Sequence, residues 1–169
     1  MRVLLDTNVF ISYLLTPQHA GSVQAIFEAL DRNQFTLLLP DEVVGEILDV
    51  IANRPHLVGR VGSDKLTVFL ELLRAVAETT PRIEQTIPAI ARDVKDDYLL
   101  AYAVVGQADY LVTGDKDLLV LGEIAEVKIV STVAFAVLCY PTQHPSHPGP
   151  MLHAPPASSG PRRSAFPPA

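Results

Sequence analysis

The sequence lacks long hydrophobic runs, cysteine pairs and an N-terminal apolar segment, and each absence excludes a class of protein. The longest uncharged apolar stretches, such as IVSTVAFAVLCY, are shorter than the roughly 18–20 residues that cross a bilayer, so we expect no membrane span. The single cysteine, Cys139, cannot form an intramolecular disulfide. The opening residues MRVLLD reach an acid too early for a signal peptide. We therefore expect a cytoplasmic protein.

A basic surface is also missing, although such a surface is typical of nucleic-acid-binding proteins. The chain has 13 Lys and Arg against 19 Asp and Glu, and its formal net charge is −6. Residues 1–140 hold all 19 acids and 11 of the bases, which gives this part a net charge of −8. Such an excess of carboxylate indicates either a highly solvated surface or a site whose charge is balanced by bound cations.

The composition changes at Pro141. Nine of the 14 prolines fall in the last 29 residues, where large aliphatic residues are almost absent. This segment cannot build a hydrophobic core, so we predict a disordered or polyproline-like tail over residues 141–169 and one folded domain over residues 1–140. The three histidines of the tail are expected to be solvated rather than to bind a metal.

Short apolar runs alternate with helical patterns in residues 1–140. The predicted strands are RVLL, FTLLLP, DYLVT and VKIV. The predicted helices lie near VFISYLL, SVQAIFEALDR, DEVVGEILDVI, DKLTVFLELLRAVAE, KDDYLLAYAVV and TVAFAVLCY, with a short turn or helix at DKDLLVL. This alternation predicts an α/β fold with a mostly parallel sheet. Ligands of such folds bind beyond the carboxyl ends of the strands, so acids that directly follow strands are candidate ligands at that edge.

Two acidic positions follow predicted strands and should therefore share one edge of the sheet. Asp6 directly follows RVLL and is either a ligand or a helix cap; Thr7 and Asn8 are nearer the helix and are better placed to cap it. Asp115 and Asp117 follow DYLVT in a turn where Gly-Asp is common. Asp115 is nearer the strand and is the better candidate ligand.

The helix near DEVVGEILDVI carries a further acid, Glu46. Its periodicity predicts a buried stripe of five residues: Val43, Val44, Ile47, Leu48 and Ile51. Glu46 falls at the edge of this apolar face, whereas Glu42 and Asp49 point to the polar face. Glu46 can therefore face the sheet edge, and an ordinary surface position is equally consistent with the pattern.

The helix near KDDYLLAYAVV carries Asp96 on the same side as Leu99, so this acid is predicted to lie on the apolar face. A buried carboxylate needs a partner, and a cation is one way to provide it. A capping box, in which Asp93 caps the helix and Asp96 completes the motif, is a second explanation that is compatible with the first. Asp97 is rotated by about 100° and is predicted to lie on the flank, as a secondary ligand at most.

Three polar residues, Asn8, Thr113 and Ser131, end strands or begin helices near these acids and can orient carboxylates or metal-bound water. A ligand set made only of oxygen atoms suits Mg²⁺ or Mn²⁺. Residues 1–140 contain no cluster of Cys and His in the sequence, which argues against zinc.

Four segments together resemble the PIN domain, in the VapC-like branch of bacterial toxin–antitoxin toxins. These segments are DTNVFISYLL, VVGEIL, DVKDDYLLAYAVVGQADYLVTGDKDLLVL and KIVSTVAFAVL, and they span nearly all of residues 1–140. The most specific feature is an acid-bearing helix that leads into ADYLVTGDKDLL. The resemblance implies a PIN-like α/β/α sandwich with a mostly parallel central sheet flanked by helices.

The resemblance also implies a ribonuclease that depends on a divalent metal, is often inhibited by a cognate antitoxin and is often dimeric. By position, the acidic quartet of the family falls on Asp6, Glu46, Asp96 and Asp115, with Asp117 as a frequent extra acid. The branch commonly has proline and asparagine where this chain has Val94 and Asp97. The helical angle favours Asp96 over Asp97 as the main ligand, and Asp97 remains a possible additional ligand.

Together with the resemblance, these residues lead us to expect hydrolysis of RNA by one or two Mg²⁺ or Mn²⁺ ions. Five basic residues are candidates for contacts with flanking phosphates: Arg54, Arg60, Arg92, Lys95 and Lys116. One alternative is a non-catalytic interaction module with a PIN fold. Another is a haloacid-dehalogenase-type phosphatase that forms an aspartyl-phosphate at Asp6; Asn8 argues against it, because it stands where the acid/base aspartate of that class belongs.

Overall fold

A computed structural model describes residues 1–16, 21–80, 82–83 and 97–140 of the chain. The predicted tail at 141–169 lies outside these described residues. Six strands and eight helices are found in the described part, in this order along the chain: β1 (Arg2–Leu5), α1 (Thr7–Leu15), α2 (Ser22–Asp31), β2 (Thr36–Leu39), α3 (Asp41–Ala52), α4 (Pro55–Val61), α5 (Ser63–Val76), β3 (Glu78–Thr79), α6 (Asp97–Val105), β4 (Tyr110–Thr113), α7 (Lys116–Leu119), β5 (Glu123–Ile124), β6 (Val127–Ser131) and α8 (Thr132–Cys139).

The six strands form one sheet in the order β3-β2-β1-β4-β6-β5. Neighbouring strands are parallel except for β5, which is antiparallel to β6. The central strand β1 is apolar, and Val3, Leu4 and Leu5 are completely buried. Such continuous burial is expected when helices cover both faces of a parallel sheet. The predicted fold class is therefore confirmed.

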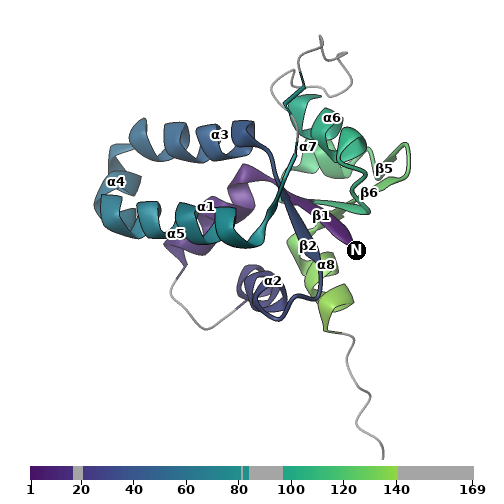
Figure 1. Cartoon of the computed structure of the whole chain (residues 1–169), viewed down its shortest axis with the longest axis horizontal. Helices are drawn as coiled ribbons and strands as arrows, with labels where there is room; N and C mark the ends of the chain where they lie inside the picture. Colours follow the sequence, from purple (N-terminus) through teal and green to yellow (C-terminus); the bar gives the residue numbers. More distant parts are fainter. Residues whose placement is uncertain (17–20, 81, 84–96, 141–169) are drawn as a thin grey trace, which may run out of the picture.

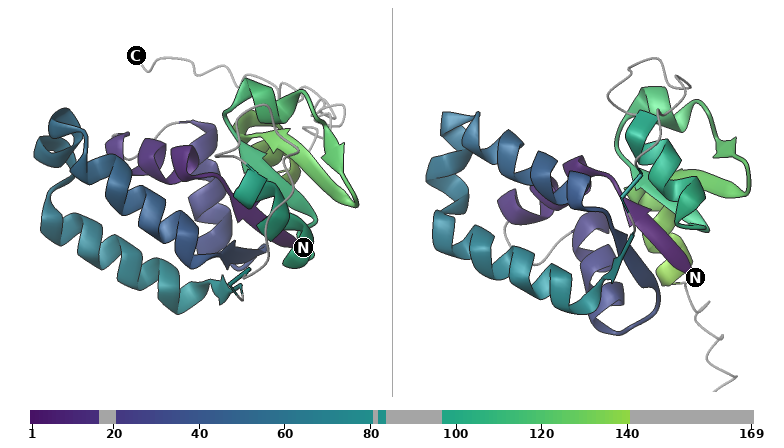
Figure 2. Two further views of the ribbon diagram at one scale, coloured as in Figure 1. Left: turned by 90° about the horizontal axis from the view of Figure 1, so that it is seen from above. Right: turned by 45° about the horizontal axis from the view of Figure 1, so that its top comes forward.

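Helices pack on both faces of the sheet (Figure 1). The helices α2 and α8 lie together on one side of β1 and β2, whereas α6 lies on the other side. The helices α3, α4 and α5 extend away from the sheet as an arm, which is seen from two further directions in Figure 2. No helix in the described part of the chain is both long enough and apolar enough to cross a membrane.

The apolar pattern predicted the main strands and helices correctly but missed three short elements. The strands β3 and β5 have two residues each, too few to show a period, and α4 begins at Pro55, a common first residue of a helix. On α3 the predicted buried stripe is correct except for Leu48, which is 43% exposed. The helix α3 packs against α1 and α4, and these neighbours cover only part of its apolar face.

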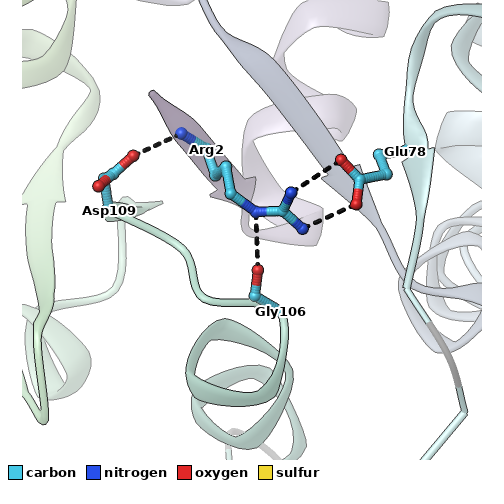
Figure 3. A network of polar contacts seen from close by, with 4 residues as sticks. All are labelled: Arg2, Glu78, Gly106 and Asp109. Carbon is cyan, nitrogen blue, oxygen red and sulfur yellow. Dashed lines mark hydrogen bonds and ion pairs between the residues drawn. The ribbon is translucent and has the colours of Figure 1, made fainter.

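Arg2 joins three elements at the amino end of the sheet (Figure 3). Its guanidinium donates two hydrogen bonds to the Glu78 carboxylate, at 2.9 and 2.8 Å, and a third to the backbone oxygen of Gly106 at 2.9 Å. Its backbone N–H donates to Asp109 at 2.6 Å. These bonds fasten the short edge strand β3 and the end of α6 to β1, so this network supports the fold. It lies at the opposite end of β1 from the predicted site.

Candidate functional site

Asp6 and Thr113 lie side by side at the carboxyl edge of the sheet. The register pairs Leu5 of β1 with Val112 of β4, and the backbone N–H of Asp6 donates to the oxygen of Val112 at 2.9 Å. The residues that follow this pair, Asp6 and Thr113, are therefore adjacent. The Thr113 hydroxyl donates a hydrogen bond to Oδ2 of Asp6 at 2.5 Å. Both side chains are buried. Parallel pairing thus places the acid after the first strand next to the end of β4, as predicted.

Asp6 is also the N-cap of α1, because its Oδ1 accepts a hydrogen bond from the backbone N–H of Asn8 at 3.3 Å. The expectation that Thr7 or Asn8 would cap this helix was wrong. The chain at Asp6 is extended and already lies at the end of β1, so the helix begins one residue earlier than that expectation required. Since the cap uses one oxygen and Thr113 binds the other, capping and a role in the site are compatible.

The electrostatic environment of Asp6 disfavours its negative charge. Burial is the main cause that raises the pKa of its carboxyl above the ordinary value of 3.8, and the nearby charge of Glu46 raises it further. The hydrogen bonds from Thr113 and Asn8 lower the pKa and only partly compensate. Neither Asp6 nor Glu46 forms an ion pair with another described residue. Two carboxylates held together without a cation are unfavourable, and a bound divalent cation would offset this repulsion.

Glu46 reaches this edge from α3 and is held by two hydroxyl groups. Its Oε2 accepts a hydrogen bond from the Thr7 hydroxyl at 2.6 Å and a short one from the Tyr98 hydroxyl. The three residues come from α3, α1 and α6, and Glu46 is half-buried. Of the two alternatives left open by the helical angle, the structure therefore shows the one in which Glu46 faces the sheet edge.

Tyr98 and Thr7 are site residues that sequence reasoning missed. Burial raises the pKa of the Tyr98 hydroxyl, and the hydrogen bond to Glu46 and its negative charge raise it further, so this hydroxyl stays protonated and keeps donating. Both residues stand beside a predicted acid in the sequence, Thr7 after Asp6 and Tyr98 after Asp97. A hydroxyl next to a predicted ligand is the signal that would have found them.

Asp115 is linked to Asp6 through Thr113. The backbone N–H of Asp115 donates to the Thr113 hydroxyl at 2.9 Å, so this one hydroxyl contacts both positions. The Asp115 side chain caps α7 by accepting a hydrogen bond from the backbone N–H of Asp117 at 2.7 Å. Asp115 is partly exposed and Asp117 is exposed. Thr113 therefore orients one of the predicted carboxylates and the backbone of another.

The second acidic helix is described only from Asp97, so Asp96 lies outside the described residues. Asp97 itself is 3% exposed, and the prediction that it lies on the flank of the helix was wrong. The reason is the wide buried arc of α6, in which Leu99, Leu100 and Tyr102 are all buried. Asp97 is rotated by about 100° from the face on which Asp96 was predicted, and because the buried arc of α6 is so wide, this rotation leaves Asp97 inside the protein.

The other predicted polar residues lie at the same edge with different contacts. Asn8 is exposed and contributes its backbone N–H to Asp6. Ser131 pairs with Thr113 in the β4–β6 register, and its hydroxyl caps α8 by accepting from the backbone N–H of Ala134 at 3.2 Å. An orienting role for the side chains of Asn8 and Ser131 remains a prediction.

The donor chemistry of this edge fits a hard divalent cation. The acids that the structure places here, Asp6, Glu46 and Asp115, offer only carboxylate oxygens, which Mg²⁺ and Mn²⁺ prefer. Within the described part of the chain, no three His, Cys, Asp or Glu side chains are grouped closely enough to hold a metal ion. The predicted fourth acid, Asp96, is not among those residues. The structure thus brings together the buried Asp6, the half-buried Glu46 and the backbone of Asp115, and the complete quartet remains a prediction.

Comparison with known proteins identifies the family and the fold. A family model described as "PIN domain" matches residues 2–117, which is more than half of the chain. A chain in the crystal structure of VapBC2 from Rickettsia felis, bound to a DNA fragment from their promoter, has a similar fold with a TM-score of 0.52 and 16% sequence identity. The alignment covers 78% of this chain and 98% of that chain. No curated protein matches this sequence. The chain belongs to the PIN-domain family.

Proposed function

We propose that this protein is a metal-dependent endoribonuclease that hydrolyses RNA phosphodiester bonds. The observation that carries this proposal is the Asp6 carboxylate, which is buried at the carboxyl edge of a PIN-domain sheet beside the charge of Glu46 and has no described cationic partner. A fold gains no stability from two such neighbouring carboxylates. A cation that binds between them would balance both charges.

The residues that would hold one or two Mg²⁺ or Mn²⁺ ions are Asp6, Glu46, Asp96 and Asp115, with Asp97 and Asp117 as additional candidates. When bound, such an ion supplies an activated water and neutralises charge on the scissile phosphate. Without the ion the same carboxylates repel the RNA backbone, so we expect activity to disappear in a chelator.

The protein's own contribution is orientation. The hydroxyls of Thr7 and Tyr98 bind the same oxygen of Glu46, which fixes the direction of its carboxylate. Thr113 does the same for Asp6 and ties the Asp115 backbone to it. Hydrogen-bond partners of this kind hold ligands in the geometry that a metal requires. Of the five basic residues expected near flanking phosphates, the three in the described part are exposed: Arg54, Arg60 and Lys116.

We further propose that the protein is the toxin of a toxin–antitoxin pair, located in the cytoplasm, with a cognate antitoxin and possible self-association as a homodimer. The similar fold in the VapBC2 complex supports a protein partner.

The first alternative function, a non-catalytic interaction module, predicts that the acidic edge binds no metal. The phosphatase alternative gives Glu46 no role, whereas the structure holds that side chain with two hydroxyls.

The test is cleavage of a panel of single-stranded and structured RNAs in Mn²⁺, Mg²⁺ or EDTA, together with Mn²⁺ binding by calorimetry. Asp6→Asn and Glu46→Gln keep the side-chain shape and remove the charge, and we expect both to abolish cleavage and weaken Mn²⁺ binding. Asp49→Asn is the matched control, because Asp49 is an exposed acid on the same helix as Glu46. A folded wild-type protein that neither binds Mn²⁺ nor cleaves any RNA would favour the interaction module.

A further inference from the structure

A second feature of the surface is a groove between α2 and α5, with a volume of about 430 Å³. Its floor is aromatic: the rings of Tyr13 and Phe27 stack with centroids 3.8 Å apart, and the Phe69 ring lies 5.7 Å from Tyr13 and 6.0 Å from Phe27. The described carboxylates of the candidate active site, Asp6, Glu46 and Asp115, do not line this groove. It is therefore a separate surface.

The rim of this α2–α5 groove is apolar on one side and acidic on the other. On α5, Leu72 is 61% exposed and Val76 is 58% exposed, and four-residue spacing places both on one face of the helix. On α2, Glu28 and Asp31 line the opposite side and are exposed. Glu28 is paired with Arg32 at 3.7 Å, whereas Asp31 forms no ion pair with any described residue and supplies the free negative charge of this side. The groove thus suits an occupant that is both apolar and positively charged.

The described part of the chain ends at the acidic side of the groove. The Tyr140 hydroxyl accepts a hydrogen bond from Arg32 at 2.7 Å and donates one to Glu28 at 3.4 Å. Since Glu28 lines the groove, residues 141–169 start within one side chain of it. The last described residue therefore contacts a side chain that lines the groove.

The sequence of the tail has the complementary chemistry. Residues 141–169 contain no acid, and their only Lys or Arg residues, Arg162 and Arg163, are followed by Phe166 and two prolines in the segment PRRSAFPPA. Proline-rich segments bind aromatic grooves at low cost in conformational entropy. We propose that residues 161–169 bind in the α2–α5 groove of the same chain, with the arginines at the acidic side and the apolar residues on Leu72 and Val76.

The connecting length allows this contact. Residues 141–160 include six prolines, so their span lies between about 25 Å for a flexible chain and about 60 Å for polyproline II, and both values exceed the roughly 15 Å length of a ten-residue helix such as α2. Tethering through a short linker gives an effective concentration in the millimolar range. A contact with a dissociation constant of about 1 mM would thus be formed in about half of the molecules at any time. The tail would then compete with any protein that uses the α2–α5 face.

Paramagnetic relaxation enhancement in the full chain tests this proposal without measuring nuclease activity. A spin label is attached at Ser164→Cys in a Cys139→Ala background, and methyl signals are recorded. We expect the signals of Leu72 and Val76 to lose most of their intensity. The signals of Val120, which is 84% exposed and does not line the groove, should keep theirs. Salt at 1 M, where the Debye length is about 3 Å, should restore the lost signals.

Charge exchange provides the matched variants. R162E with R163E should remove the broadening, and Asp31→Lys in that background should restore it, while the remaining methyl spectrum shows that each variant is folded. Absent or uniform broadening would overturn the proposal. Broadening that appears only between spin-labelled and isotope-labelled molecules in a mixture would also overturn it, because the occupant would then be a second copy. Neither result would affect the proposed nuclease, whose residues lie elsewhere.

Discussion

Replacing Thr113 by valine tests whether one hydroxyl organises the acidic edge. Valine has nearly the same shape as threonine and is favoured in strands, so this change leaves packing almost intact. It removes the donor to Asp6 at 2.5 Å and the acceptor of the Asp115 N–H at 2.9 Å. A hydrogen bond to a charged group contributes about 1.5–3 kcal/mol, and a partly buried N–H left without an acceptor costs about 1 kcal/mol.

We therefore expect Thr113→Val to lower the free energy of unfolding by about 3 kcal/mol at pH 7 in the absence of metal. For a chain of this size that corresponds to a fall in Tm of about 9 °C. The control is Thr113→Ser, which keeps the hydroxyl, loses one buried methyl group and should cost about 1 kcal/mol. Urea unfolding and differential scanning calorimetry in EDTA measure both variants.

The pH dependence of this loss identifies Asp6 as the partner. Burial raises the pKa of Asp6 in the folded protein above 3.8, so the folded state binds the proton more tightly than the unfolded state. Stability therefore falls as the pH rises from 3.8 through the folded pKa. Without the Thr113 donor this pKa rises further, so the difference between Thr113→Val and wild type should be largest at pH 7 and shrink as Asp6 becomes protonated. A difference that is the same at pH 7 and pH 4, or no greater than that of Thr113→Ser, would refute the reasoning.

Two further predictions concern the site and the fold. Tyr98→Phe removes one donor to Glu46 and should weaken Mn²⁺ binding by roughly 10-fold, measured by calorimetry, while the circular dichroism spectrum stays unchanged; unaltered affinity would show that Tyr98 does not position Glu46. Gly106→Ala should destabilise the protein by about 1–3 kcal/mol, because the new methyl would lie 2.8 Å from the backbone oxygen of Tyr102. Gly45→Ala is its control: this position in α3 has open space, so the change should stabilise by up to about 1 kcal/mol in the same urea unfolding experiment.

Local sequence patterns determined the architecture and the location of the candidate site. Short apolar runs that alternate with helical patterns predicted the parallel sheet. Strands covered by helices on both faces consist almost entirely of apolar residues, so they appear in the sequence as such runs. The position of Asp6 directly after the first strand and of Asp115 soon after DYLVT predicted that both lie at one edge, because parallel strands end on the same side. These inferences need only the order of residues along the chain.

Only the tertiary structure decided how the acidic edge is held together. Thr7 and Tyr98 are 39 and 52 residues from Glu46, and Thr113 is 107 residues from Asp6, so no local pattern reports that these groups meet. The burial of Asp97 depends on how α6 is covered by its neighbours. The period of a helix gives the direction of a side chain, whereas its partners depend on which other elements pack at that point, and this is decided by the whole fold.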